Sequence, residues 1–351
     1  MNKQKVLLLT TFLIISGAFN FVIAAEKDKD SRFEVGFDYI SEVQSNLKKV
    51  NWAHQLHIDL SAKITDNLYL KARTLSVGKT RDKEILPNDL QVFSNLIEAN
   101  LLLSLYLGGL DWLIDEHNNV FVGVHNMNDE FFASEVTSLF TNASCGIFPT
   151  LSSNFTAANF PYSSLGIQYK YDSEDLSFVG SIYNGQGYNR FSGRENSFRF
   201  CPKSDGVHFL SQFEFKHNDS HYFVGGAMNY GTLYDFVERK ARTAAWTYLE
   251  QKLAPSVYLI ADYSRTFFSD SFCKEFMGIG TKIDVESSGS NVFEFGLFSD
   301  YARFDGNKEF ATELTCKYSF SDHFFLQPSL HFMHNDLSSN LIGLIRFGME
   351  F

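Results

Sequence analysis

Segments of about ten residues in which apolar and polar side chains alternate recur along the sequence, and this period of two constrains the fold more than any other feature. In the last segment, Leu341 and Ile345 fall on one side and Arg346 on the other. Such alternation is typical of strands, because successive side chains point to opposite faces of a sheet. Sixteen segments of this kind can be placed, so the sequence predicts an all-β fold with about 16 strands.

Charged residues recur on one side of these segments, as with Glu309, Glu313 and Lys317. The dry core of a β-sandwich could not hold so many unpaired charges, whereas a water-filled lumen can. About ten residues is also the length with which a tilted strand crosses a bilayer. After the N-terminal segment, no run of about 18 apolar residues is uninterrupted, which excludes helical membrane spans. We therefore expect a transmembrane antiparallel β-barrel.

The connections between the expected strands alternate in length. Short polar turns, such as residues 65–67 and 321–323, alternate with generally longer segments, notably 79–94, 127–162 and 184–205. Bacterial outer-membrane barrels combine short periplasmic turns with longer extracellular loops, and an even strand number leaves both chain ends on the periplasmic side. The 37 Phe and 16 Tyr fit the aromatic girdles of such barrels.

The first residues have the features of an export signal. Lys3 and Lys5 precede an apolar stretch over residues 6–22, and Ala24-Ala25 supplies small residues for cleavage. We predict a signal peptide over residues 1–25 and a barrel domain over 26–351, located in the bacterial outer membrane. Removing the two lysines changes the net charge from −11 to about −13. This negative charge argues against nucleic acid as a partner.

The connection over residues 127–162 is too long for an ordinary loop without a function. A sixteen-stranded barrel is wide enough to leave an aqueous channel, and a third long loop that folds inward would narrow it. The segment combines hydrophobic anchors such as Phe140 and Phe148 with hydrogen-bonding groups such as Asn142. We expect it to fold into the lumen; the alternative is a surface loop.

Around this connection the sequence resembles the carbohydrate-selective porins of Gram-negative outer membranes. The resemblance rests on the runs Gly-Val-His-Asn-Met-Asn-Asp-Glu-Phe at 123–131, Ser-Leu-Phe-Thr-Asn-Ala-Ser at 138–144 and Gly-Ile-Phe-Pro at 146–149, with Pro161 and Leu165-Gly166 beyond them. The strand pattern and the terminal Phe351 extend it over the mature chain. It implies passive diffusion of small hydrophilic solutes, in particular sugars, through a pore narrowed by the third loop.

Candidate residues for this pore are inward-facing charges and polar or aromatic groups of the third loop. Sugars have apolar faces and hydroxyl edges, so their path needs aromatic surfaces beside hydrogen-bonding groups. We expect Arg73 and Arg346 to face acidic side chains of the third loop across the constriction. The candidates are Arg73, Glu98, Asp129, Glu130, Glu135, Asn142, Phe148 and Arg346.

Three other functions stay open at this point. A general or cation-preferring porin fits the excess of acidic over basic residues. A barrel enzyme would need a nucleophile paired with a histidine, and the sequence contains no recognisable catalytic, metal-binding or cofactor motif. A surface adhesin would use the long loops to bind partners.

The expected partners are outer-membrane lipids with lipopolysaccharide, and sugars as transported solutes. The resemblance to porins implies a monomer or a homotrimer. Of the four cysteines, Cys145 and Cys201 fall in expected surface loops and are the favoured pair if a disulfide forms.

Overall fold

A computed structural model of the chain describes residues 32–80, 85–86, 88–96, 100–132, 134–231, 240–286 and 292–351. The expected signal peptide and Glu98 lie outside the described residues. No helix of the described part is long and apolar enough to cross a membrane.

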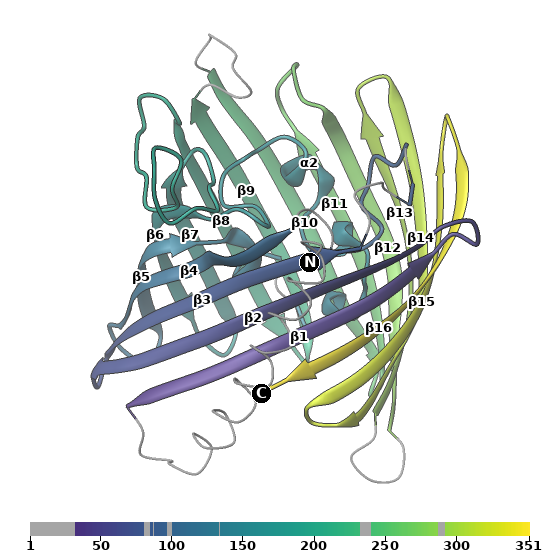
Figure 1. Cartoon of the computed structure of the whole chain (residues 1–351), viewed down its shortest axis with the longest axis horizontal. Helices are drawn as coiled ribbons and strands as arrows, with labels where there is room; N and C mark the ends of the chain where they lie inside the picture. Colours follow the sequence, from purple (N-terminus) through teal and green to yellow (C-terminus); the bar gives the residue numbers. More distant parts are fainter. Residues whose placement is uncertain are drawn as a thin grey trace, which may run out of the picture.

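Sixteen antiparallel strands form one closed barrel in which each strand pairs with its neighbours in sequence and β1 pairs with β16 (Figure 1). All sixteen expected strands are confirmed. Their bounds are β1 Phe33–Ser45, β2 Val50–Thr65, β3 Leu68–Lys79, β4 Leu101–Leu113, β5 Asn118–His125, β6 Ser164–Asp172, β7 Leu176–Asn184, β8 Val207–His217, β9 Ser220–Gly231, β10 Lys240–Ala254, β11 Val257–Thr266, β12 Cys273–Glu286, β13 Val292–Phe304, β14 Asn307–Ser321, β15 Phe324–Asn335 and β16 Ser339–Glu350.

Burial follows the alternation that the sequence contains. Along β15, Leu330 and Phe332 are 44% and 47% exposed, whereas His331 between them is 1% exposed. Most exposed side chains of β15 are apolar and face outward, whereas Gln327, Ser329, His331 and Asn335 face the lumen. The outer surface is therefore suited to lipid and the inner surface to water.

The barrel closes where the last strand meets the first. Phe351 exchanges two backbone hydrogen bonds of 2.9 Å with Phe37, and the two rings stack with centroids 5.0 Å apart. The Phe351 ring also stacks on His323 at 4.6 Å. The terminal residue thus continues the β1–β16 ladder and covers the seam with an aromatic cluster.

The connections differ from the expectation at two places. β4 was expected to start at residue 95, but it starts at Leu101, because residues before it belong to a segment that packs inside the barrel. The connection between β13 and β14 is a tight turn at Asp305 and Gly306, although it lies on the long-loop side.

The disulfide favoured between Cys145 and Cys201 is not formed, and all four cysteines are free. Cys145 is buried in the hydrophobic cluster inside the barrel, whereas Cys201 lies in the connection between β7 and β8. The expectation was wrong because it placed both residues in surface loops.

Candidate functional site

The connection between β5 and β6, here called the third loop (described residues 126–132 and 134–163), lies inside the barrel (Figure 1). It contains three short 3₁₀ turns, Met127–Asp129, Thr137–Leu139 and Ala143–Cys145, and the helical turn α2 (Pro149–Ser152). Its aromatic rings pack on rings of the inner wall: Phe132 on Trp246 at 4.9 Å, Phe140 on Phe298 at 5.3 Å and Phe148 on Phe276 at 5.3 Å. This packing makes the third loop part of the largest hydrophobic cluster among the described residues.

A buried carboxylate holds the middle of the third loop. Glu313 on β14 is fully buried and accepts hydrogen bonds from the backbone N–H groups of Thr141 and Asn142, both at 2.9 Å. The Thr141 hydroxyl donates to the same carboxylate at 2.8 Å. A carboxylate buried in this way is tolerated because donors surround it.

A second connection also folds inward, which the sequence pattern did not indicate. In the second loop (described residues 80, 85–86, 88–96 and 100), Ile85, Leu86 and Phe93 pack against the inner wall of β14–β16. Glu309, fully buried and four residues before Glu313, accepts hydrogen bonds from the backbone N–H groups of Leu90 and Gln91. Two glutamates on one face of β14 therefore hold two different loops.

The second and third loops also bind each other. The backbone N–H of Asn95 donates to Thr141 O at 2.9 Å, and that of Ala143 donates to Val92 O at 3.1 Å. The Ser144 hydroxyl donates to the Gln91 side chain at 2.9 Å. The two loops thus form one structure that occupies one side of the lumen.

Arg73 does face the third loop, as expected. Its guanidinium contacts Asp59 on β2 at 2.5 Å and Asp129 of the third loop at 3.4 Å. Burial raises the pKa of Asp129 to about 6, although Arg73 opposes that shift. Next to it, Glu130 pairs with Lys170 of β6 at 2.9 Å. These pairs join the third loop to the wall on either side of it.

Arg346 does not face the acidic residues of the third loop, and this expectation was wrong. Its side chain pairs with Glu42 on the neighbouring strand β1 at 2.8 Å and donates to Asn95 of the second loop at 2.7 Å. The second loop lies between Arg346 and the third loop. Knowing that Arg346 points inward was therefore not enough to predict its partner.

Three other candidate residues have different positions. Asn142 is buried and donates to Asp300 of β13 at 2.8 Å, and Phe148 is buried in the hydrophobic cluster, so both anchor the third loop. Glu135 is exposed and lines a cavity described below. Glu98 lies outside the described residues.

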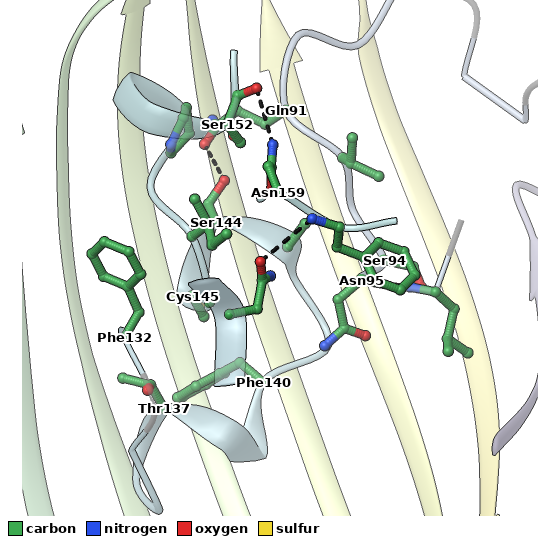
Figure 2. A pocket seen from close by; sticks show the side chains of 18 of the residues that line it. Gln91, Ser94, Asn95, Phe132, Thr137, Phe140, Ser144, Cys145, Ser152 and Asn159 are labelled. Carbon is green, nitrogen blue, oxygen red and sulfur yellow. Dashed lines mark hydrogen bonds between the residues drawn. The ribbon is translucent and has the colours of Figure 1, made fainter. Parts of the chain in front are cut away.

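The first cavity lies between the two inward loops and the inner faces of β2 and β4 and has a volume of about 460 Å³. Figure 2 shows Ser94 and Asn95 of the second loop across from Phe132 and Thr137 of the third. None of the described residues that line this cavity is Asp, Glu, Lys or Arg. Its lining combines aromatic rings with amide, hydroxyl and imidazole groups, namely Tyr106, Phe132, Phe140, Phe160, Gln55, His57, Gln91, Ser94, Asn95, Asn128, Thr137 and Asn159.

Three buried polar atoms of this lining, Nε2 of Gln91 and two atoms on β2, have no hydrogen bond within the described protein. His57 uses its Nδ1 on Asp38 at 3.0 Å, while its Nε2 is buried without a hydrogen bond, as is Oε1 of Gln55. Both residues are on the inner face of β2, and the His57 ring stacks on Tyr106 at 5.1 Å. Buried polar atoms need a partner, so these two are suited to bind a polar solute or water in the cavity.

The second cavity lies toward the short turns and has a volume of about 740 Å³. Its lining is rich in carboxylates, namely Asp129, Glu130, Glu135, Asp172, Glu214, Asp219 and Glu250, against Lys170, Lys216 and Lys252. Ser134 of the third loop lines both cavities. The residues around Ser134 thus lie between an uncharged cavity on the long-loop side and an acidic one on the short-turn side.

Sequence reasoning missed Gln55, Tyr106, Asn128 and Asn159 as cavity residues. The alternation along β2 indicates that Gln55 points inward. The cavity itself forms only because the second loop folds inward and supplies its opposite side. Among the described residues, no group of three or more His, Cys, Asp or Glu could hold a metal ion.

Comparisons with known proteins agree with this architecture. The family described as carbohydrate-selective porin, OprB family, matches residues 88–272, more than half of the chain. No curated protein sequence matches.

Among solved structures, the high-pH structure of Pseudomonas putida OprB has a TM-score of 0.74 at 11% identity, over 91% of this chain and 94% of that one. The anion-selective porin from Comamonas acidovorans has a TM-score of 0.60 at 12% identity, over 91% and 100%. A loop-deletion mutant of Vibrio cholerae OmpT has a TM-score of 0.58 at 9% identity, over 92% and 100%. At these identities the likeness shows the fold.

Proposed function

Because this chain belongs to the OprB family of carbohydrate-selective porins, we propose that sugars cross it through the first cavity, past Ser134, and through the second cavity. As a porin of this family, it resides in the bacterial outer membrane and admits small hydrophilic solutes. The observation that carries the proposal is the lining of the first cavity, which has aromatic and polar side chains but no Asp, Glu, Lys or Arg among its described residues.

This lining suits a neutral solute with many hydroxyl groups. The face of a sugar ring can stack on Phe160, which is partly exposed, while Gln55 and His57 offer polar atoms that have no protein partner. An ion receives no opposite charge there to replace its hydration shell. Each hydrogen bond contributes only about 0.5–1.5 kcal/mol, so the solute is bound weakly enough to leave.

The test is the block of ion current by sugar in a planar bilayer. Neutral mono- and disaccharides should reduce the current in a saturable way. In Gln55→Leu the apparent dissociation constant should rise roughly two- to tenfold, because one hydrogen bond is lost. Gln251→Leu is the matched control, since Gln251 lies on the outward side of β10 and lines neither cavity. A current that no sugar changes would contradict the proposal.

A second candidate function, a cation-preferring porin, is favoured by the carboxylates of the second cavity. The two functions differ in which cavity determines selectivity. A reversal potential that reports strong cation preference, together with conductance indifferent to sugars, would support this alternative.

Further parts of the proposal concern the state of the mature protein. We infer that residues 1–25 are a signal peptide cleaved near Ala24-Ala25, and that the barrel works as a monomer or homotrimer among outer-membrane lipids and lipopolysaccharide. We also infer a channel without catalytic function, in which the long loops restrict the pore rather than act as an adhesin. Mass spectrometry of the purified protein tests the cleavage and the subunit number.

A further inference from the structure

A row of charged residues crosses the outer face of the barrel at its long-loop end. Arg265 on β11 pairs in register with Glu275 on β12, Glu275 pairs with Arg303 on β13, and Arg303 pairs with Lys308 on β14. Each lies within two residues of the end of its strand on the long-loop side. We call these four residues the rim row.

The rim row faces the membrane and not the pore. The residues beside it in sequence, Ser264, Phe276, Ala302 and Glu309, are fully buried and point inward. Two residues further along each strand, on the same outward side, the next row consists of Tyr263, Met277, Tyr301 and Phe310. Aromatic and apolar residues in that position are typical of the membrane interface, so the rim row lies at the level of the lipid headgroups.

The rim row carries excess positive charge. Glu275 is the one carboxylate of the rim row and has two partners. Arg303 contacts one of its carboxylate oxygens at 3.1 Å, and the Tyr263 hydroxyl donates to the other at 2.7 Å. Within the described chain, no carboxylate lies within 4.0 Å of the charged groups of Arg265 or Lys308. The nearby Lys274 and Asp305 pair with each other at 2.7 Å and add no net charge.

We propose that the rim row binds the phosphate groups of lipopolysaccharide in the outer leaflet. Adjacent strands are about 4.8 Å apart, so Arg303 and Lys308 can contact one phosphate together, while Arg265 lies about 10 Å from Arg303. The planar guanidinium matches phosphate geometry with two parallel hydrogen bonds, and the lysine adds a compact charge. A phosphate attached to acyl chains fits better than a free ion, because the aromatic row below is placed to contact those chains.

Native mass spectrometry of the barrel in detergent tests the proposal, with bisphosphorylated lipid A and its dephosphorylated form as probes. The triple variant Arg265→Gln/Arg303→Gln/Lys308→Gln should bind the phosphorylated form at least tenfold more weakly than the wild type. The control Arg190→Gln/Arg194→Gln/Lys203→Gln removes the same charge from the connection between β7 and β8 and should bind normally. Heat-modifiable migration in detergent gels checks that each barrel is folded.

Glu275→Gln supplies a test in the opposite direction. Removing the carboxylate releases Arg303, so phosphorylated lipid A should bind a few-fold more tightly. The proposal is overturned if the triple variant binds both lipids like the wild type, or if inorganic phosphate at equal concentration displaces the lipid. A triple variant that changes its subunit number but keeps its lipid binding would instead identify the rim row as an interface between copies.

Discussion

At the scale of single residues, Asp129 of the third loop, which lines the second cavity and contacts Arg73, is a side chain whose charge responds to pH. Its pKa is raised to about 6 from an ordinary value of 3.8, because burial opposes its charged form more than Arg73 favours it. The carboxyl is therefore charged above about pH 6 and neutral below it. The cost of keeping it charged in the folded protein exists above pH 6 and disappears as the pH falls toward 3.8.

This titration predicts that cation preference falls between pH 7 and pH 5. An ion passing within about 5 Å of a unit charge in water gains or loses on the order of 0.8 kcal/mol, so the permeability ratio should change about two- to fivefold. Reversal potentials in a salt gradient measure that ratio. Asp129→Asn should remove the step near pH 6, and an unchanged step in this variant would assign the titration to another group.

At the scale of elements, two loops depend on two glutamates of one strand. Glu313 holds the third loop and Glu309 the second, each through backbone N–H donors. In a glutamine one carboxylate oxygen becomes an amide nitrogen, which cannot accept these hydrogen bonds. A buried donor left without its acceptor costs about 1–3 kcal/mol, enough to shift a docked loop toward undocked states.

Glu313→Gln should therefore give a larger and noisier single-channel conductance and faster proteolysis within the third loop. Glu309→Gln should expose the second loop in the same assay and leave the third less affected. Glu294→Gln is the matched control, because Glu294 on β13 pairs with Lys282 and lines neither cavity. If both loop variants conduct and resist protease as the wild type does, the glutamates are not the anchors.

The start of the fourth strand shows a limit of predicting strands from alternating polarity. The expected fourth strand included Asn95, yet this residue belongs to the second loop, where its side chain accepts from Arg346. Alternating polarity does not distinguish a strand from an irregular segment that packs one side on a wall and the other in water. The same limit explains why the predicted partner of Arg346 was wrong, because no local sequence pattern indicates that the second loop folds inward.

At the scale of the whole molecule, the barrel is stable only once the first and last strands meet. Phe351 contributes backbone hydrogen bonds that any residue can make, and a ring that stacks on Phe37 and His323. Phe351→Ala keeps the backbone hydrogen bonds and removes the ring contacts. Losing a partly buried aromatic ring should lower the free energy of unfolding by about 1–3 kcal/mol.

Urea unfolding of the refolded barrel in lipid vesicles measures this loss. Phe295→Ala removes an outward ring from β13, away from the seam, and should cost less because this ring is half exposed to lipid. Equal losses in the two variants would mean that the seam has no special role.

The alternation of side chains and the polar turns were sufficient, by themselves, to predict sixteen strands, their outward and inward faces and the closed barrel. These features are local, because a strand with one face in lipid and one in water must place its residues by parity. The length and composition of residues 127–162 added the inward third loop as an expectation, and the resemblance over residues 123–166 added the sugar path.

Only the tertiary structure decided what lies inside the barrel. It brought Arg73 to Asp129, set Glu42 and Asn95 beside Arg346, and left the first cavity with an uncharged lining. These contacts join residues far apart in sequence, and they depend on how two long loops share one lumen. Parity determines which side chains point inward, but packing determines which of them the solute can reach.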